Sequence, residues 1–187
     1  MGNMLVVGID PGKQGAVATL FSDGSLDVLD LSDFYDDSGA AHSSVNPGKF
    51  GKWIRKRTAA LGCSLTVCCE KPIFVGGGFT IKTPMSMFES YGVIRGVCAA
   101  HGLSFIGVNP REWQKHYPAL YHPKQKRTKE ESVVEAKRLF PNYADVFEYE
   151  VLKGRCKGNT VLLDGRAEAA LIARYAQDVV SELRDAG

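Results

Sequence analysis

The chain has 187 residues, of which 44% are hydrophobic and 24% are charged, a composition typical of a globular protein in water. The length suits one well-buried domain, so we expect residues 1–187 to form a single domain. No apolar stretch approaches the roughly 20 residues of a membrane span, and the first strand follows no secretory signal, so we expect neither a membrane protein nor a secreted one.

The net charge of +2 is too small to identify a partner, but the basic residues are unevenly distributed. One group lies between Lys49 and Arg57, and a second between Lys115 and Lys129. Either group could be a solvated face or a phosphate-binding surface. The five cysteines are an odd number and lack zinc-ligand spacing, which favours reduced thiols that serve as small core residues.

The N-terminal part of the chain contains three short apolar runs separated by turn residues. Pro11-Gly12 ends the first run, and Asp23-Gly24 favours a tight turn between the second and the third. This pattern predicts a three-stranded antiparallel meander. The expected elements are strands at 4–9, 15–21 and 25–31, a surface loop at 32–47 and a helix at 47–61.

The rest of the chain alternates strands and helices. Thr83, Asn109 and Thr128 precede proline or a third-position glutamate, as helix N-caps do. The expected elements are a strand at 65–70, a flexible loop at 72–83, a helix at 84–101, a strand at 104–108, helices at 110–117 and 128–140 around a loop at 118–127, an irregular stretch at 141–163 with a short helix near 143–147, and a helix at 164–183.

A meander followed by α/β crossovers predicts an α/β fold. We expect a mixed five-stranded sheet flanked by helices on both faces, with the first strand central and the fourth beside it. This arrangement resembles the ribonuclease H-like fold.

Four acidic residues occupy places where such a fold puts chemistry. Asp10 and Glu70 end apolar strands, and Asp164 and Glu168 open the last helix with i, i+4 spacing. Singly, each has a simpler interpretation as a turn residue, a solvated strand end or a helix cap. Together they predict a site for two Mg²⁺ ions, because carboxylate oxygens are the ligands that Mg²⁺ prefers and an ion would relieve the repulsion between Asp164 and Glu168.

Four segments in this order carry a family resemblance: Gly8-Ile9-Asp10-Pro11-Gly12, Glu70 after a strand, Tyr91-Gly92-Val93-Ile94-Arg95-Gly96, and Asp164-Gly165-Arg166-Ala167-Glu168-Ala169. Their combination resembles the RuvC-type Holliday-junction resolvases, the phage and chloroplast branches more closely than the bacterial one. The resemblance covers about residues 4–176.

The resemblance implies an endonuclease that makes paired symmetrical nicks across a four-way DNA junction, works as a homodimer and uses Mg²⁺, with Mn²⁺ as a substitute. The metal ligands would be Asp10, Glu70, Asp164 and Glu168, and Lys115 and Lys129 would lie near the scissile phosphate. It also implies an intracellular protein of the cytoplasm, the nucleoid or a phage-infected cell, or of an organelle if a transit peptide has been removed.

This chain departs from the bacterial pattern in two respects. Its last two acids have the spacing D-x-x-x-E instead of D-x-x-D, which leaves open whether Asp164 contacts metal directly. Its glycine-rich loop after Glu70 is longer, and Phe74 or Phe79 is either the aromatic wedge at the junction centre or a local anchor. The expected DNA contacts are Phe74, Phe79, Lys124, Lys126 and Arg127.

Other functions compete with junction cleavage. The same carboxylates would serve a ribonuclease H-like nuclease acting on an RNA–DNA hybrid or on other branched DNA. A non-catalytic junction-binding protein and a nucleotide-binding module are further alternatives, disfavoured by the four acids and by the chain length. For the dimer, the helix at 84–101 offers a stripe that either forms the interface or packs on the sheet: Met87, Tyr91, Ile94 and Cys98.

Overall fold

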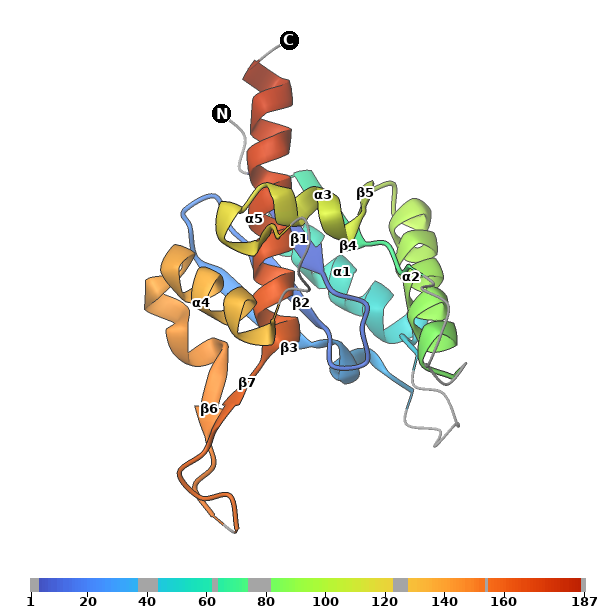
Figure 1. The fold of residues 1–187 in the computed structure, drawn as a ribbon. Helices are drawn as coiled ribbons and strands as arrows, with labels where there is room; N and C mark the ends of the chain where they lie inside the picture. The colour runs from blue at the N-terminus through green and yellow to red at the C-terminus, as the bar shows by residue number, and fades with distance from the viewer. Residues whose placement is uncertain are drawn as a thin grey trace.

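The computed structural model describes residues 4–36, 44–61, 64–73, 82–122, 128–153 and 155–185. Its centre is a five-stranded sheet in the order β3-β2-β1-β4-β5 (Figure 1). The strands β1, β2 and β3 form the antiparallel meander, and β4 and β5 continue the sheet in parallel beside β1. The expected mixed sheet with a central first strand is therefore confirmed. The strand bounds are β1 Met4–Ile9, β2 Ala16–Leu20, β3 Leu26–Asp30, β4 Ser64–Glu70 and β5 Ser104–Val108.

Helices cover both faces of this sheet, as expected. One layer contains α1 (Pro47–Leu61) and α2 (Lys82–Ala100), and the other contains α3 (Pro110–Lys115), α4 (Lys129–Leu139) and α5 (Asp164–Asp185). Alternation along β1 divides its side chains between two cores, because successive residues of a strand point to opposite faces. Leu5, Val7 and Ile9 pack with the α1/α2 layer, while Val6 packs with the α5 layer.

The helix α5 lies directly on β1, backbone against backbone. A Cβ added at Gly8 of β1 would lie 2.2 Å from the carbonyl oxygen of Ala169 and from the amide nitrogen of Ala173. A Cβ at Gly165 would lie 2.0 Å from the carbonyl oxygen of Gln14, in the β1–β2 loop. Two glycines thus allow the first turns of α5 to sit on the carboxyl end of β1.

Two segments differ from their expected structure. At the start of the loop expected at 32–47, Leu31–Phe34 forms the 3₁₀ helix η1, and both Phe34 and Val45 are buried. Apolar side chains hold both ends of this segment in the core, although its polar composition suggested a surface loop; residues 37–43 lie outside the described part. The stretch 141–163 forms the 3₁₀ helix η3 (Pro141–Val146) and a hairpin of β6 (Glu148–Glu150) and β7 (Thr160–Leu162). Strands of three residues are too short to show alternation in a sequence.

Helix ends follow the expected signals in part. Thr128 and Glu131 form the predicted capping box at the start of α4. Asn109 precedes α3 as expected, but its side chain makes no cap hydrogen bond, and α3 ends at Lys115, before the 3₁₀ helix η2 (Pro118–Leu120). Gly102, at φ +64°, follows the end of α2.

The stripe expected on α2 packs on the sheet. Ile94 and Cys98 are fully buried, and the ring of Tyr91 contacts that of Phe105 on β5. Of the two alternatives for this stripe, the structure therefore shows packing on the sheet at Tyr91, Ile94 and Cys98. The helix instead exposes a different apolar face: Met85, Phe88, Gly92, Gly96 and Ala99.

Among the helices that the structure describes, none combines the length and the apolar character required to cross a membrane.

Candidate active site

Asp10 and Glu70 lie side by side at the carboxyl ends of β1 and β4. The parallel register of these strands reaches Ile9 opposite Cys69, so Asp10 and Glu70 are the next residues on each. Ile9 and Cys69 pack with the α1/α2 layer. By alternation, both carboxylates point to the opposite side, toward α5.

Asp10 also shapes the turn that follows β1. The backbone N–H of Gly12 donates to Asp10 Oδ1 at 2.9 Å, and the N–H of Asp10 donates to the carbonyl oxygen of Ala16 at 3.1 Å. The turn interpretation of Asp10 is thus correct and compatible with a site role. Burial and, secondarily, the negative charge of Asp10 raise the pKa of Tyr35 to about 12, so this phenol stays protonated beside the carboxylate.

Glu70 is oriented by a buried indole that the sequence analysis missed. Trp113 Nε1–H donates to Glu70 Oε2 at 2.6 Å, and the Trp113 side chain is fully buried. A hydrogen bond to a carboxylate in a partly buried place restricts its rotamers and satisfies the indole donor. Nothing in the local pattern distinguishes Trp113 from an ordinary core residue of α3.

Asp164 and Glu168 each contact a side chain of α4. Lys129 Nζ lies 3.1 Å from Asp164 Oδ1 and 2.9 Å from Oδ2, and Ser132 Oγ donates to Glu168 Oε1 at 3.3 Å. The i, i+3 spacing on α4 matches the i, i+4 spacing on α5, since both spacings keep residues on one helical face. The Lys129 side chain is 64% exposed, so its ion pair is worth little and is easily exchanged for another partner.

The geometry therefore brings Asp10 and Glu70 together at one edge of the sheet, while Asp164 and Glu168 open the helix that packs on β1. Among the residues that the structure describes, no group of three or more His, Cys, Asp or Glu side chains is arranged to hold an ion. The donor chemistry still fits a hard divalent cation, because four carboxylates offer only oxygen ligands. The two-ion site at Asp10, Glu70, Asp164 and Glu168 stays a prediction.

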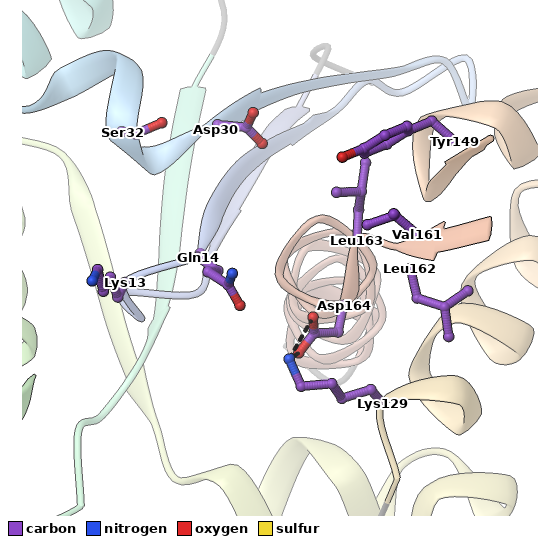
Figure 2. A pocket seen from close by; sticks show the side chains of 11 residues that line it. Lys13, Gln14, Asp30, Ser32, Lys129, Tyr149, Val161, Leu162, Leu163 and Asp164 are labelled. Carbon is purple, nitrogen blue, oxygen red and sulfur yellow. Dashed lines mark hydrogen bonds and ion pairs between the residues drawn. The ribbon is translucent and has the colours of Figure 1, made fainter. Parts of the chain in front are cut away.

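A pocket of about 450 Å³ opens beside the start of α5 (Figure 2). Figure 2 shows Lys129 reaching Asp164 on one side, while Asp30 and Ser32 lie on the opposite side. Arg166 donates to both oxygens of Asp30 at 2.6 and 2.7 Å, which ties the first turn of α5 to the end of β3. The pocket lining is Lys13, Gln14, Gly15, Asp30, Ser32, Lys129, Tyr149 and residues 161–164.

The other expected site residues are only partly placed. Lys115 ends α3, and its Nζ lies 5.4 Å from the centroid of the Tyr121 ring, a cation–π contact. The expected DNA-contacting residues lie outside the described part of the chain: Phe74, Phe79, Lys124, Lys126 and Arg127.

Comparison with known proteins identifies the fold. No family model matches the sequence, and no curated protein matches it. Among solved structures, RuvC of T. thermophilus in complex with a Holliday junction substrate is 12% identical, with 96% of each chain covered and a TM-score of 0.54. The yeast mitochondrial Holliday junction resolvase Ydc2 is 13% identical over 96% of this chain and 80% of that one, with a TM-score of 0.55. The chain thus has a RuvC-like fold of the ribonuclease H-like type, as its sequence motifs indicated.

Proposed function

We propose that this chain is a metal-dependent endonuclease that resolves four-way DNA junctions by paired phosphodiester hydrolysis. The observation that carries the proposal is the pairing of Asp10 and Glu70 at adjacent strand ends that face α5, the helix that begins with Asp164 and Glu168. The RuvC-like fold adds support, because one solved relative is bound to a Holliday junction and another is named a resolvase of such junctions.

The four carboxylates would hold Mg²⁺, for which Mn²⁺ would substitute. Bound there, the metal would supply an activated water and stabilise the leaving oxygen. The hydrogen bonds from Trp113 and from the Gly12 amide restrict the orientations of Glu70 and Asp10 before any metal binds. The exposed ion pair with Lys129 leaves Asp164 able to turn toward an ion.

Cations near the carboxylates would stabilise negative charge on the scissile phosphate. Lys129 is within contact distance of Asp164 and largely exposed, so its ammonium can follow a phosphate that approaches this edge. Such a charge stabilises the developing negative charge of the transition state more than the ground state. We assign Lys115 the same role and assign DNA binding to Phe74, Phe79, Lys124, Lys126 and Arg127.

A homodimer would address the two symmetry-related strands of a junction. The exposed face of α2 is the proposed interface, because Phe88 and Met85 are 47% and 53% exposed and a Cβ at Gly92 or Gly96 would meet nothing within 4 Å. Large apolar side chains beside small residues suit close helix packing. Light scattering should detect a dimer that Phe88→Asp dissociates, and a monomer that still makes paired nicks would refute the interface.

The function is tested by cleavage of a synthetic four-way junction. With Mg²⁺, the protein should introduce two symmetrical nicks and should leave a linear duplex and an RNA–DNA hybrid of the same sequence intact. A chelator should abolish cleavage, and added Mn²⁺ should restore it. Preferred cleavage of the hybrid would instead establish a ribonuclease H activity, and junction binding without cleavage would establish a non-catalytic binding protein.

A further inference from the structure

The β6–β7 hairpin projects from the body of the protein beside the start of α5. Figure 1 shows it extending away from the sheet, at the opposite end of the molecule from the C-terminus. Its strands pair in register from Glu148 opposite Leu162 to Glu150 opposite Thr160, and the amide of Val151 donates to the carbonyl oxygen of Asn159 at 2.9 Å. The hairpin is therefore a formed element and not a random excursion of the chain.

The base of the hairpin is fixed to the rest of the domain. Lys137 of α4 forms an ion pair with Glu148, and the amide of Leu163 donates to the carbonyl oxygen of Phe147 at 2.8 Å. The base also lines the pocket at Asp164, through Tyr149 and residues 161–163. Any ligand that reaches Asp164 through this pocket lies next to the hairpin.

The tip of the hairpin is basic and exposed. Lys153, Arg155 and Lys157 are all exposed, and the sequence from 151 to 163 contains no acidic residue. Leu152 is also 73% exposed, so the tip adds nothing to the core. A two-stranded hairpin of this length has little stability of its own, and folding does not require these cations. Their concentration on a fixed projection fits a polyanionic partner.

The reach of the hairpin matches DNA bound at the candidate active site. Lys157 and Asp164 are seven positions apart, which at about 3.3 Å per extended residue places the tip within roughly 20 Å of the carboxylate. Phosphates along one strand are about 3.4 Å apart in projection on the helix axis, so the tip would meet the backbone within roughly six nucleotides of the scissile phosphate.

We propose that the β6–β7 hairpin is a DNA-contacting arm, in which Lys153, Arg155 and Lys157 bind backbone phosphates of the duplex that flanks the cleaved strand. This inference rests on the proposed function for the identity of the polyanion. The arm contributes affinity and sets the position of the duplex, and it takes no part in the chemical step.

The test compares two triple variants with equal loss of charge. The first is Lys153→Gln with Arg155→Gln and Lys157→Gln. The control is Lys52→Gln with Arg55→Gln and Lys56→Gln, three exposed cations of α1 on the other face of the sheet. The first variant should bind a four-way junction at least about tenfold more weakly, with a salt slope smaller by about 2.7 if all three contacts are lost. The control should change both quantities little, and cleavage at saturating DNA should be similar in the two variants.

A second measurement uses the unaltered protein. Cys156 lies exposed between two of the tip cations, whereas Cys68, Cys69 and Cys98 are buried. A bound junction should slow alkylation of the Cys156 peptide several-fold, as read by mass spectrometry. Equal binding by both triple variants, or no protection of Cys156, would overturn the arm while cleavage by the wild type left the proposed function standing. Junction binding that depends on the hairpin but is never followed by cleavage would support the arm and overturn the proposed nuclease function. Absence of any DNA binding would overturn both proposals.

Discussion

The two helical layers cover the same sheet, yet among the described residues at the ends of β1 and β4 the carboxylates face one layer and apolar side chains the other. On the α1/α2 side, the last residues of β1 and β4 are Ile9 and Cys69, both fully buried in an apolar core. On the α5 side, the corresponding positions are Asp10 and Glu70, beside a helix that approaches β1 through Gly8. Strand alternation thus gives the two faces of the sheet different side chains at the same strand ends, and the proposed chemistry belongs to the α5 face.

The largest effect is expected when a carboxylate of the proposed site is replaced by its uncharged amide. Asp10→Asn, Glu70→Gln, Asp164→Asn and Glu168→Gln should each reduce junction cleavage by about 10² to 10³, because a metal ligand or its charge is lost. Binding should persist or improve, since negative charge facing the DNA is removed.

The matched control for these variants is Asp23→Asn, an exposed acid in the turn between β2 and β3 at the other end of the sheet from Asp10, which should cleave like the wild type. Single-turnover kinetics with Mg²⁺ measure the cleavage rate of the four site variants and of the control. If two of the four site variants keep a near wild-type rate, the site is wrongly assigned.

A second comparison substitutes one glycine on each side of the sheet: Gly8 of β1, which faces α5, and Gly51 of α1. Gly8→Ala would drive a methyl group into the α5 backbone and should lower the free energy of unfolding by about 3 kcal/mol. Gly51→Ala on α1 meets its first neighbour, His101 Nε2, at 3.6 Å, an ordinary contact, so it should raise stability by about 0.5–1 kcal/mol through helix propensity. Urea unfolding decides, and equal effects would show that α5 is not seated on β1 as described.

Substitutions of the basic residues at the site should affect the cleavage rate and the DNA affinity to different degrees. Lys129→Ala and Lys115→Ala should reduce the cleavage rate by roughly tenfold to a hundredfold with a smaller loss of affinity, because their charges act mainly in the transition state. Lys52→Ala on the exposed face of α1 is the control. An effect on the dissociation constant alone would place both lysines among the DNA-binding residues.

The smallest expected effect concerns the ion pair that ties α5 to β3. The hydrogen-bonded Arg166 guanidinium lowers the pKa of Asp30, so the pair stabilises the folded state above the ordinary pKa of this carboxyl, near 3.8, and loses that contribution as the pH falls through the lowered value. The Asp30 side chain is 41% exposed, so Asp30→Asn should cost less than about 1 kcal/mol at pH 7. The cost should shrink below about pH 4 in urea titrations; a cost that is constant with pH would mean that it is not electrostatic.

The sequence was sufficient for the parts of the fold that have a clear period or a clear cap. Apolar runs predicted the five strands, and Thr128 with Glu131 predicted the start of α4. It was insufficient where tertiary contacts decide. Phe34 and Val45 are buried within a polar stretch, and β6 and β7 are too short to carry a signal.

The site was predictable in part. Strand ends placed Asp10 and Glu70 next to each other, because the parallel register of β1 and β4 brings these positions together, while the four-carboxylate site with Asp164 and Glu168 stays a prediction. Trp113 and Ser132, which contact Glu70 and Glu168, are unremarkable in their own helices and become identifiable only when α3 and α4 are packed on the sheet. The sequence could not decide between the two alternatives for the α2 stripe, since Ile94 and Cys98 fit a core as well as an interface, and the structure shows them in the core.

The central claim is that a divalent metal binds between the ends of β1 and β4 and the start of α5. Anomalous diffraction from crystals soaked in Mn²⁺ tests it most directly. We predict manganese bound to oxygens of Asp10 and Glu70 and to at least one of Asp164 and Glu168, with Lys129 turned away from Asp164, and no such signal in Asp10→Asn crystals. Manganese bound elsewhere, or an unchanged Lys129–Asp164 pair with no metal beside it, would contradict the account.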